Sequence, residues 1–228
     1  MARIGVGEVS LEISLAGEGQ PLLFLHGGDY FAQNQDFLDR LARHWRVLIP
    51  RHPGFGGSER PDGFRTVHDL AYLYLDLLEQ QQLNDVVLVG SSFGGWIALE
   101  MCVRSVERIG RLALIDTLGV KFGGRERRDI ADIYALPADE VLQRTFFDPE
   151  RAAPDYTELD DAEAASIASD RAATALYGCD PTCTIPVCED GCTGWGCRPW
   201  SSGAKATASC RPITAKRSVG RCPMPASS

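Results

Sequence analysis

The chain has 228 residues, a formal net charge of −8 and a sequence pI near 5.0. A chain of this length fits one domain with a substantial core. The acidic balance argues against a nucleic-acid-binding protein, because affinity for phosphates needs clustered Lys and Arg. The N-terminal residues show no basic segment before an apolar run, and no stretch reaches the roughly 18 apolar residues of a membrane span. We therefore expect a soluble cytoplasmic protein with neither a nucleic-acid nor a membrane partner.

Strand and helix patterns alternate along the first 119 residues. Residues 9–15 alternate apolar and polar side chains, which is typical of a half-buried strand. Residues 66–83 carry leucines at helical spacing, and Thr66 is suited to cap the start of that helix. Continuous apolar runs predict buried strands at residues 21–25, 46–50, 86–89 and 111–119. This order predicts a mostly parallel sheet with helices on both faces.

Residues 120–177 differ from the preceding part because they are polar, acidic and rich in alanine. Helical stretches are expected at ADEVLQRTF (residues 138–146) and at DDAEAASIASDRAATALYG (residues 160–178). We interpret residues 120–177 as a helical insertion that lies over the sheet edge.

The motif GSSFG at residues 90–94 matches G-x-S-x-G and stands between an expected strand and an expected helix. A serine on such a sharp turn projects its hydroxyl above the sheet, so Ser92 is the candidate nucleophile. The flanking glycines are needed because side chains there would collide with neighbouring backbone. The amide of Phe93, at the helix N-terminus, is the first candidate donor to an oxyanion.

A second donor is expected from the turn after residues 21–25, where HGG occupies residues 26–28. Glycine at position 28 lets the backbone approach a reacting carbonyl, so the Gly28 amide is the second candidate donor. His26 is expected to organise this turn through hydrogen bonds rather than to transfer protons. Gly27 and Ser91 are the expected substrate-binding residues.

Four segments, FLHGGD, RHPGFGGS, VGSSFGGWIALE and LALIDTLG, make the chain resemble the α/β-hydrolase superfamily over roughly residues 9–177. The resemblance implies a doubly wound, mainly parallel eight-stranded sheet with a helical cap inserted after the sixth strand. It divides the chain into a core at residues 1–119, a cap at 120–177 and a tail at 178–228. It also implies a triad in chain order Ser, acid, His. The implied substrate is a small ester, lactone or related carbonyl compound, including compounds cleaved at a C–C bond. No cofactor or metal is implied. The oligomeric state stays open.

The triad acid and base are not found where this resemblance places them. All four histidines, at positions 26, 44, 52 and 68, precede Ser92 in the chain. His52 lies in a loop near the expected site and is the only weak candidate for a base. Asp116 follows an expected strand near the right rim, but we expect a structural role for it. Since a serine nucleophile needs a base and an acid that orients it, we expect little or no triad-dependent turnover.

The last 51 residues differ from the rest of the chain in composition. They hold seven of the eight cysteines and no Leu, Phe or Tyr, and they carry six Lys and Arg against three Asp and Glu. A genuine metal-binding or disulfide-bonded tail on a non-enzymatic binding protein is one interpretation. However, the cysteine spacings of four and five do not match paired zinc knuckles, and disulfides conflict with a cytoplasmic protein.

The interpretation that we favour for this tail is a shifted reading frame after about residue 177. Every Cys codon begins with TG, so a frame that starts one base earlier turns each Cys into Leu, Val or Met. That frame permits a stretch resembling the superfamily's seventh strand and its acid-bearing turn. Loss of the final strands would leave an apolar sheet edge, for which we expect poor solubility.

Overall fold

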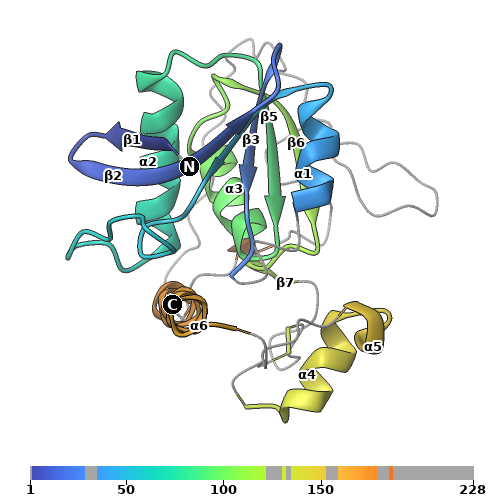
Figure 1. Cartoon of the computed structure of the whole chain (residues 1–228). Coiled ribbons are helices and arrows are strands. Elements are labelled where there is room, and N and C mark those ends of the chain that lie inside the picture. The colour runs from blue at the N-terminus through green and yellow to red at the C-terminus, as the bar shows by residue number, and fades with distance from the viewer. Residues whose placement is uncertain are drawn as a thin grey trace, which may run out of the picture.

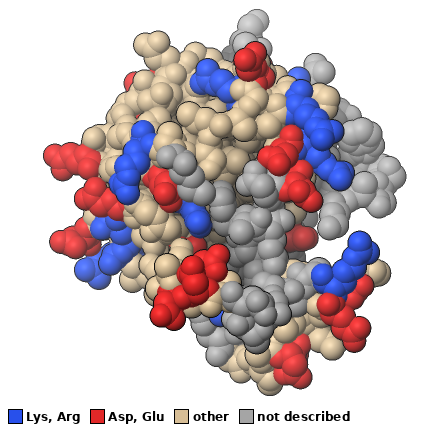
Figure 2. All heavy atoms as spheres, in the orientation of Figure 1, with Lys and Arg blue, Asp and Glu red and all other residues tan. Residues whose placement is uncertain are grey.

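A computed structural model describes residues 2–28, 35–121, 130–131, 135–152, 159–178 and 185–186. Figure 1 shows a twisted sheet with helices on both of its faces and further helices beyond one end of the strands. In the part of the chain so described, no helix has the length and hydropathy needed to cross a membrane. On the face shown in Figure 2, the acidic and basic side chains of the described residues are interspersed.

Six strands form the main sheet in the order β1-β2-β4-β3-β5-β6. The pairings β1–β2 and β2–β4 are antiparallel, whereas β4–β3, β3–β5 and β5–β6 are parallel. The strands span Ala2–Val6 (β1), Val9–Ala16 (β2), Pro21–Leu25 (β3), Arg46–Pro50 (β4), Val86–Ser91 (β5) and Ile109–Ile115 (β6). The predicted α/β fold with a mostly parallel sheet is therefore confirmed for these strands.

The helices fall into two groups. Three pack on the sheet: Gln35–Ala42 (α1), Val67–Gln80 (α2) and Phe93–Arg104 (α3). Three follow the last strand of the main sheet: Ala138–Thr145 (α4), Pro149–Ala152 (α5) and Asp161–Gly178 (α6). As predicted, Thr66 caps α2: its hydroxyl accepts a hydrogen bond from the Asp69 amide at 3.3 Å, and the Asp69 carboxylate accepts one from the Thr66 amide at 2.8 Å.

Both faces of the central strands β3, β4 and β5 are buried, which explains why these strands are continuously apolar. Alternate residues of β3 enter opposite cores, because side chains of a strand alternate between its faces. Leu23 and Leu25 pack with α2 and α3, for example against Leu70. Leu22 and Phe24 pack on the other face with Leu38 of α1.

The structure corrects the predicted bounds of the last long strand. β6 begins at Ile109 rather than Arg111 and ends at Ile115 rather than Gly119. It ends there because Asp116 has a positive φ of 44°, which is incompatible with an extended ladder. The sequence also gave no signal for β1 or α1, and a short pairing of Val120–Lys121 (β7) with Ile185–Pro186 (β8) was not expected.

Helices α4 to α6 lie beyond the carboxyl ends of the parallel strands (Figure 1). The division of the chain at residues 119 and 177 stays a prediction. Of the cysteine-rich tail, only Gly178 and residues 185–186 belong to the described residues. The interpretations of the tail therefore lie almost wholly outside them.

Candidate active site

Ser92 occupies a sharp turn between β5, which ends at Ser91, and α3, which begins at Phe93. Its backbone has φ 51° and ψ −114°, a conformation that L-residues other than glycine rarely adopt. Such strain costs on the order of 1–3 kcal/mol and persists only where the surrounding structure enforces it. The strand-turn-helix elbow that the G-x-S-x-G motif predicted is therefore present, and the role of Ser92 as nucleophile stays a prediction.

Two positions of this turn must be glycine, because neighbouring backbone atoms leave no room there for a side chain. A Cβ atom on Gly90 would lie 2.6 Å from the carbonyl oxygen of Gly94 and 2.6 Å from the Cα of Gly95. A Cβ atom on Gly94 would lie 2.1 Å from the carbonyl oxygen of Leu25. The predicted collision with neighbouring backbone is therefore confirmed at both positions.

The same close approach brings the HGG turn to the elbow. β3 and β5 are parallel neighbours with Leu25 opposite Gly90, so the turns after both strands lie at one edge of the sheet. Gly27 is buried and Gly28 half-buried in the turn after β3. The structure thus brings the segment of Gly27 and Gly28 next to the elbow, as predicted. Their roles as substrate-binding residue and oxyanion donor, like those of Ser91 and Phe93, stay predictions.

The turn after β6 holds the elbow from the other side. The Ser92 amide donates a hydrogen bond to the Ile115 carbonyl at 2.8 Å, and the Leu118 amide donates one to the Ser92 carbonyl at 3.0 Å. Asp116 follows Ile115, so it stands beside Ser92 in the parallel register. Its side chain is exposed and forms no hydrogen bond or ion pair with the described residues.

His26 and His52 form a buried stacked pair beside the elbow. Their ring centroids are 3.9 Å apart, and the rings are exposed by only 1% and 0%. His26 Nδ1 lies 2.6 Å from the Gly27 carbonyl, and its Nε2 accepts from the His52 amide at 3.2 Å. His26 therefore carries its proton on Nδ1. This agrees with the expectation that His26 organises the turn.

His52 is neutral and held by hydrogen bonds at both ring nitrogens. Its Nε2 donates to the His26 carbonyl at 3.0 Å, and its Nδ1 accepts from the Tyr74 hydroxyl at 2.6 Å. Burial lowers the pKa of His52 to about 4. Burial and the neighbouring His52 also hold the pKa of His26 well below its ordinary value. Since neither nitrogen of His52 is available, it is not placed to take a proton from Ser92.

The other two histidines lie away from this arrangement. His44 is exposed in the turn before β4. His68 is on α2, where it lies 3.2 Å from the Glu100 carboxylate on α3. Sequence reasoning missed Tyr74 as the partner of His52, because the two are 22 positions apart and no local pattern joins them. Within the described residues, no group of His, Cys, Asp and Glu is arranged to hold a metal ion.

Comparison with known proteins places the chain in a family. A family model described as "Alpha/beta hydrolase family" matches residues 22–207. The match spans more than half of the chain and includes β3, β5, the elbow and α6. The chain therefore belongs to the alpha/beta hydrolase family.

Curated relatives with named activities match about half of the chain. It is 32% identical over 121 residues to a 2-hydroxy-6-oxo-2,4-heptadienoate hydrolase of Pseudomonas putida, covering 51% of this chain and 44% of that protein. It is 39% identical over 115 residues to a 2-hydroxymuconate semialdehyde hydrolase of Pseudomonas sp. strain CF600, covering 47% of this chain and 40% of that protein. The chain thus spans less than half the length of these relatives.

A solved structure supports the fold over a longer part of the chain. The meta-cleavage product hydrolase of Pseudomonas fluorescens IP01 superposes with a TM-score of 0.56 at 22% identity, covering 78% of this chain and 72% of that one. At this identity the likeness shows the fold alone.

Proposed function

We propose that this chain carries the acyl-transfer site of a serine hydrolase, with Ser92 as nucleophile. The observation that carries the proposal is the elbow, in which a strained serine is held at the start of α3 by glycines that admit no side chain. In the proposed reaction, Ser92 Oγ attacks a carbonyl carbon, and the leaving group departs to give an acyl-enzyme that water hydrolyses. The amides of Phe93 and Gly28 donate hydrogen bonds to the oxyanion that forms in each step.

The proposed substrate is a small ester, a lactone or a related carbonyl compound. The two Pseudomonas relatives support the last of these classes, because they are named as hydrolases of a 6-oxo-dienoate and of a semialdehyde. A carbonyl group that accepts the serine oxygen is common to all of these compounds. The reaction needs no cofactor, because nucleophile, oxyanion donors and water supply its parts.

We further propose that these 228 residues turn substrates over slowly. No histidine follows Ser92, and the buried His52 cannot serve as the base. Oxyanion stabilisation and binding alone leave roughly 10³ to 10⁴ over the reaction in water when a triad member is removed. A slow reaction is therefore expected, and the part of it that depends on Ser92 should need an added base.

The test is the hydrolysis of 4-nitrophenyl acetate by the full chain and by Ser92→Ala, with and without imidazole. Imidazole supplies in solution the base that the chain lacks, and Ser92→Ala corrects for direct attack of imidazole on the ester. We expect similar slow rates for the two proteins without imidazole, and a faster, Ser92-dependent rate when imidazole is present. Equal rates for both proteins in all conditions would refute Ser92 as nucleophile. Hydrolysis at ordinary enzyme rates without imidazole would refute the incomplete triad.

A further inference from the structure

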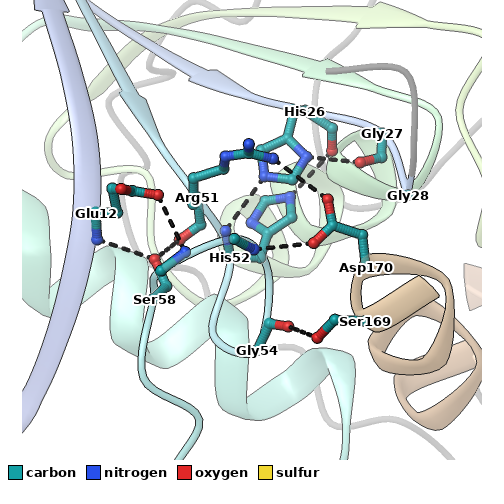
Figure 3. A network of polar contacts seen from close by, with 12 residues as sticks. Glu12, His26, Gly27, Gly28, Arg51, His52, Gly54, Ser58, Ser169 and Asp170 are labelled. Carbon is teal, nitrogen blue, oxygen red and sulfur yellow. Dashed lines mark hydrogen bonds and ion pairs between the residues drawn. The ribbon is translucent and has the colours of Figure 1, made fainter. Parts of the chain in front are cut away.

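One face of α6 lies against the loops at the carboxyl edge of the sheet. Asp170, Ala173 and Tyr177 are its buried residues and follow a helical spacing of three and four. Asp170 and Tyr177 meet the loop after β4, and their neighbour Thr174 meets the turn after β3, all more than 110 positions earlier in the chain. Figure 3 shows Ser169 and Asp170 of α6 pointing toward these loops.

Side chains on this face touch both residues proposed to donate to the oxyanion. The Thr174 hydroxyl has one proton, which it shares between the Gly28 carbonyl at 3.1 Å and the Asp170 carbonyl of its own helix at 2.9 Å. The ring of Tyr177 stacks on the ring of Phe93, with centroids 6.1 Å apart and an interplanar angle of 28°. One helix of the insertion is therefore in contact with both halves of the proposed oxyanion hole.

Thr174 also packs closely against the α-carbon of Gly28. A Cβ atom on Gly28 would lie 2.6 Å from Thr174 Oγ1 and 2.7 Å from Thr174 Cγ2. The place of a side chain at position 28 is thus filled by Thr174. This gives a reason for glycine at position 28 in addition to the approach of a reacting carbonyl.

Further hydrogen bonds hold α6 against the loop after β4. The Asp170 carboxylate accepts from the Gly56 amide at 2.9 Å and from Arg51 Nη1 at 3.3 Å. The Tyr177 hydroxyl donates to the Pro53 carbonyl at 3.1 Å. These bonds do not involve Thr174, so they keep the helix in place when its hydroxyl is removed.

The carbonyls on both sides of the Gly28 α-carbon are held. His26 Nδ1–H donates to the Gly27 carbonyl. Because peptide bonds in the described residues are trans, the amide of Gly28 points away from the atom that binds the Gly27 oxygen. Thr174 holds the next peptide through the Gly28 carbonyl. Both dihedral angles of a glycine, the residue with the greatest backbone freedom, are thereby restricted.

We propose that α6 sets the geometry of the oxyanion hole, with Thr174 as a positioning residue that holds the Gly28 peptide. The inference rests on the proposed function, since it presumes that the Gly28 amide binds an oxyanion. On this inference, α6 is itself a component of the acyl-transfer site.

The test uses the full chain with Thr174→Val, which keeps the shape of the side chain and removes its hydroxyl. The Ser92-dependent rate is measured with 4-nitrophenyl acetate and imidazole. Loss of a whole oxyanion donor typically costs roughly 10² to 10³ in kcat. Because the amide is loosened rather than removed, we expect a decrease in kcat of about 3- to 30-fold with KM nearly unchanged. Hydrogen exchange in residues 22–28 should also become faster.

Two further variants separate positioning from general effects on the helix. Thr174→Ser keeps the hydroxyl and should retain the rate of the unchanged chain. Thr145→Val is a matched control, because the Thr145 hydroxyl also donates to the carbonyl four residues earlier, at 2.8 Å, but is exposed on α4. This control should leave both the rate and the exchange in residues 22–28 unchanged.

The outcomes distinguish this inference from the proposed function. A Ser92-dependent rate that is equal in Thr174→Val and Thr145→Val, with equal exchange in residues 22–28, overturns the positioning role and leaves the nucleophile in place. The absence of any Ser92-dependent rate in the unchanged chain when imidazole is present overturns the proposed function, and the role of Thr174 in catalysis with it. A decrease in Thr174→Ser as large as in Thr174→Val also contradicts the role of the hydroxyl.

Discussion

The elbow and the α6 contact border the same proposed site but are built in different ways. In the elbow, backbone atoms approach so closely that residues 90 and 94 admit no Cβ atom. At the α6 contact, separate side-chain hydrogen bonds join segments more than 110 positions apart. A single added Cβ atom should therefore destabilise the whole elbow. The α6 contact should weaken by about one hydrogen bond at a time.

The largest effect is expected for Gly94→Ala. Its Cβ atom would lie 2.1 Å from the Leu25 carbonyl oxygen, and that oxygen belongs to backbone that cannot rotate away. We expect a loss of about 3 kcal/mol in the free energy of unfolding, measured by urea denaturation. Gly63→Ala is the matched control, since no atom lies within 4 Å of its Cβ position. Equal stability of the two variants would contradict the account of the elbow.

The stacked histidines between the two regions predict a dependence of stability on pH. The folded-state pKa of His52, about 4, lies below its ordinary value of 6.5, so the folded state resists protonation. This contribution to stability is fully present above about pH 6.5, decreases as the pH falls from 6.5 towards 4, and is lost below about 4. The difference corresponds to about 3 kcal/mol.

Urea denaturation at pH 7 and at pH 4.5 measures this effect. His44→Gln, which removes an exposed histidine, should show the same decrease as the unchanged chain. A free energy of unfolding that does not fall between these two pH values would argue against a neutral buried pair.

Ser92→Gly is expected to stabilise the fold while it removes the nucleophile. Glycine adopts the positive φ of position 92 without strain, whereas alanine does not. The relief of strain exceeds the extra entropy of the unfolded glycine chain, so we expect a gain of about 1 kcal/mol. Thermal unfolding of Ser92→Gly beside Ser92→Ala measures it. A lower melting temperature for Ser92→Gly than for Ser92→Ala would show that the elbow is not strained at this residue.

Tyr177→Phe is expected to have a small effect of opposite sign to that of Ser92→Gly. It keeps the ring that stacks on Phe93 and removes the hydrogen bond to Pro53, which should cost about 1 kcal/mol. Tyr72→Phe, on the exposed face of α2, is the control and should change stability by less than about 0.5 kcal/mol. If Tyr177→Phe behaves like Tyr72→Phe in urea denaturation, the hydroxyl contributes nothing to the α6 contact.

The same contrast explains what could be predicted from the sequence. The strand at residues 21–25, the helix after Thr66 and the elbow around Ser92 depend on residues that are neighbours in the chain, and all three are found where they were expected. The α6 contact, in contrast, is marked by no local sequence pattern. In the sequence, Asp170 and Thr174 look like any polar residues of an alanine-rich helix. Their partners in the loops after β3 and β4 become visible only in the folded chain.

Two other features lay beyond sequence reasoning for a similar reason. His52 could be judged an unsuitable base only once its ring was seen between His26 and Tyr74. The end of β6 at Ile115 results from the positive φ of Asp116, and an aspartate in an apolar run does not by itself indicate that conformation.

The central claim is that the chain has a complete elbow with a nucleophilic serine but no base to activate it or to activate water afterwards. Peptide mapping by mass spectrometry after reaction with 4-nitrophenyl acetate and imidazole tests this claim most directly. Because deacylation also needs a base, the acetyl group should persist on Ser92 once the imidazole is removed. We predict an acetyl group on Ser92 that is absent from Ser92→Ala. Acetylation of Ser91 or of surface residues alone, with Ser92 unmodified, would contradict the account.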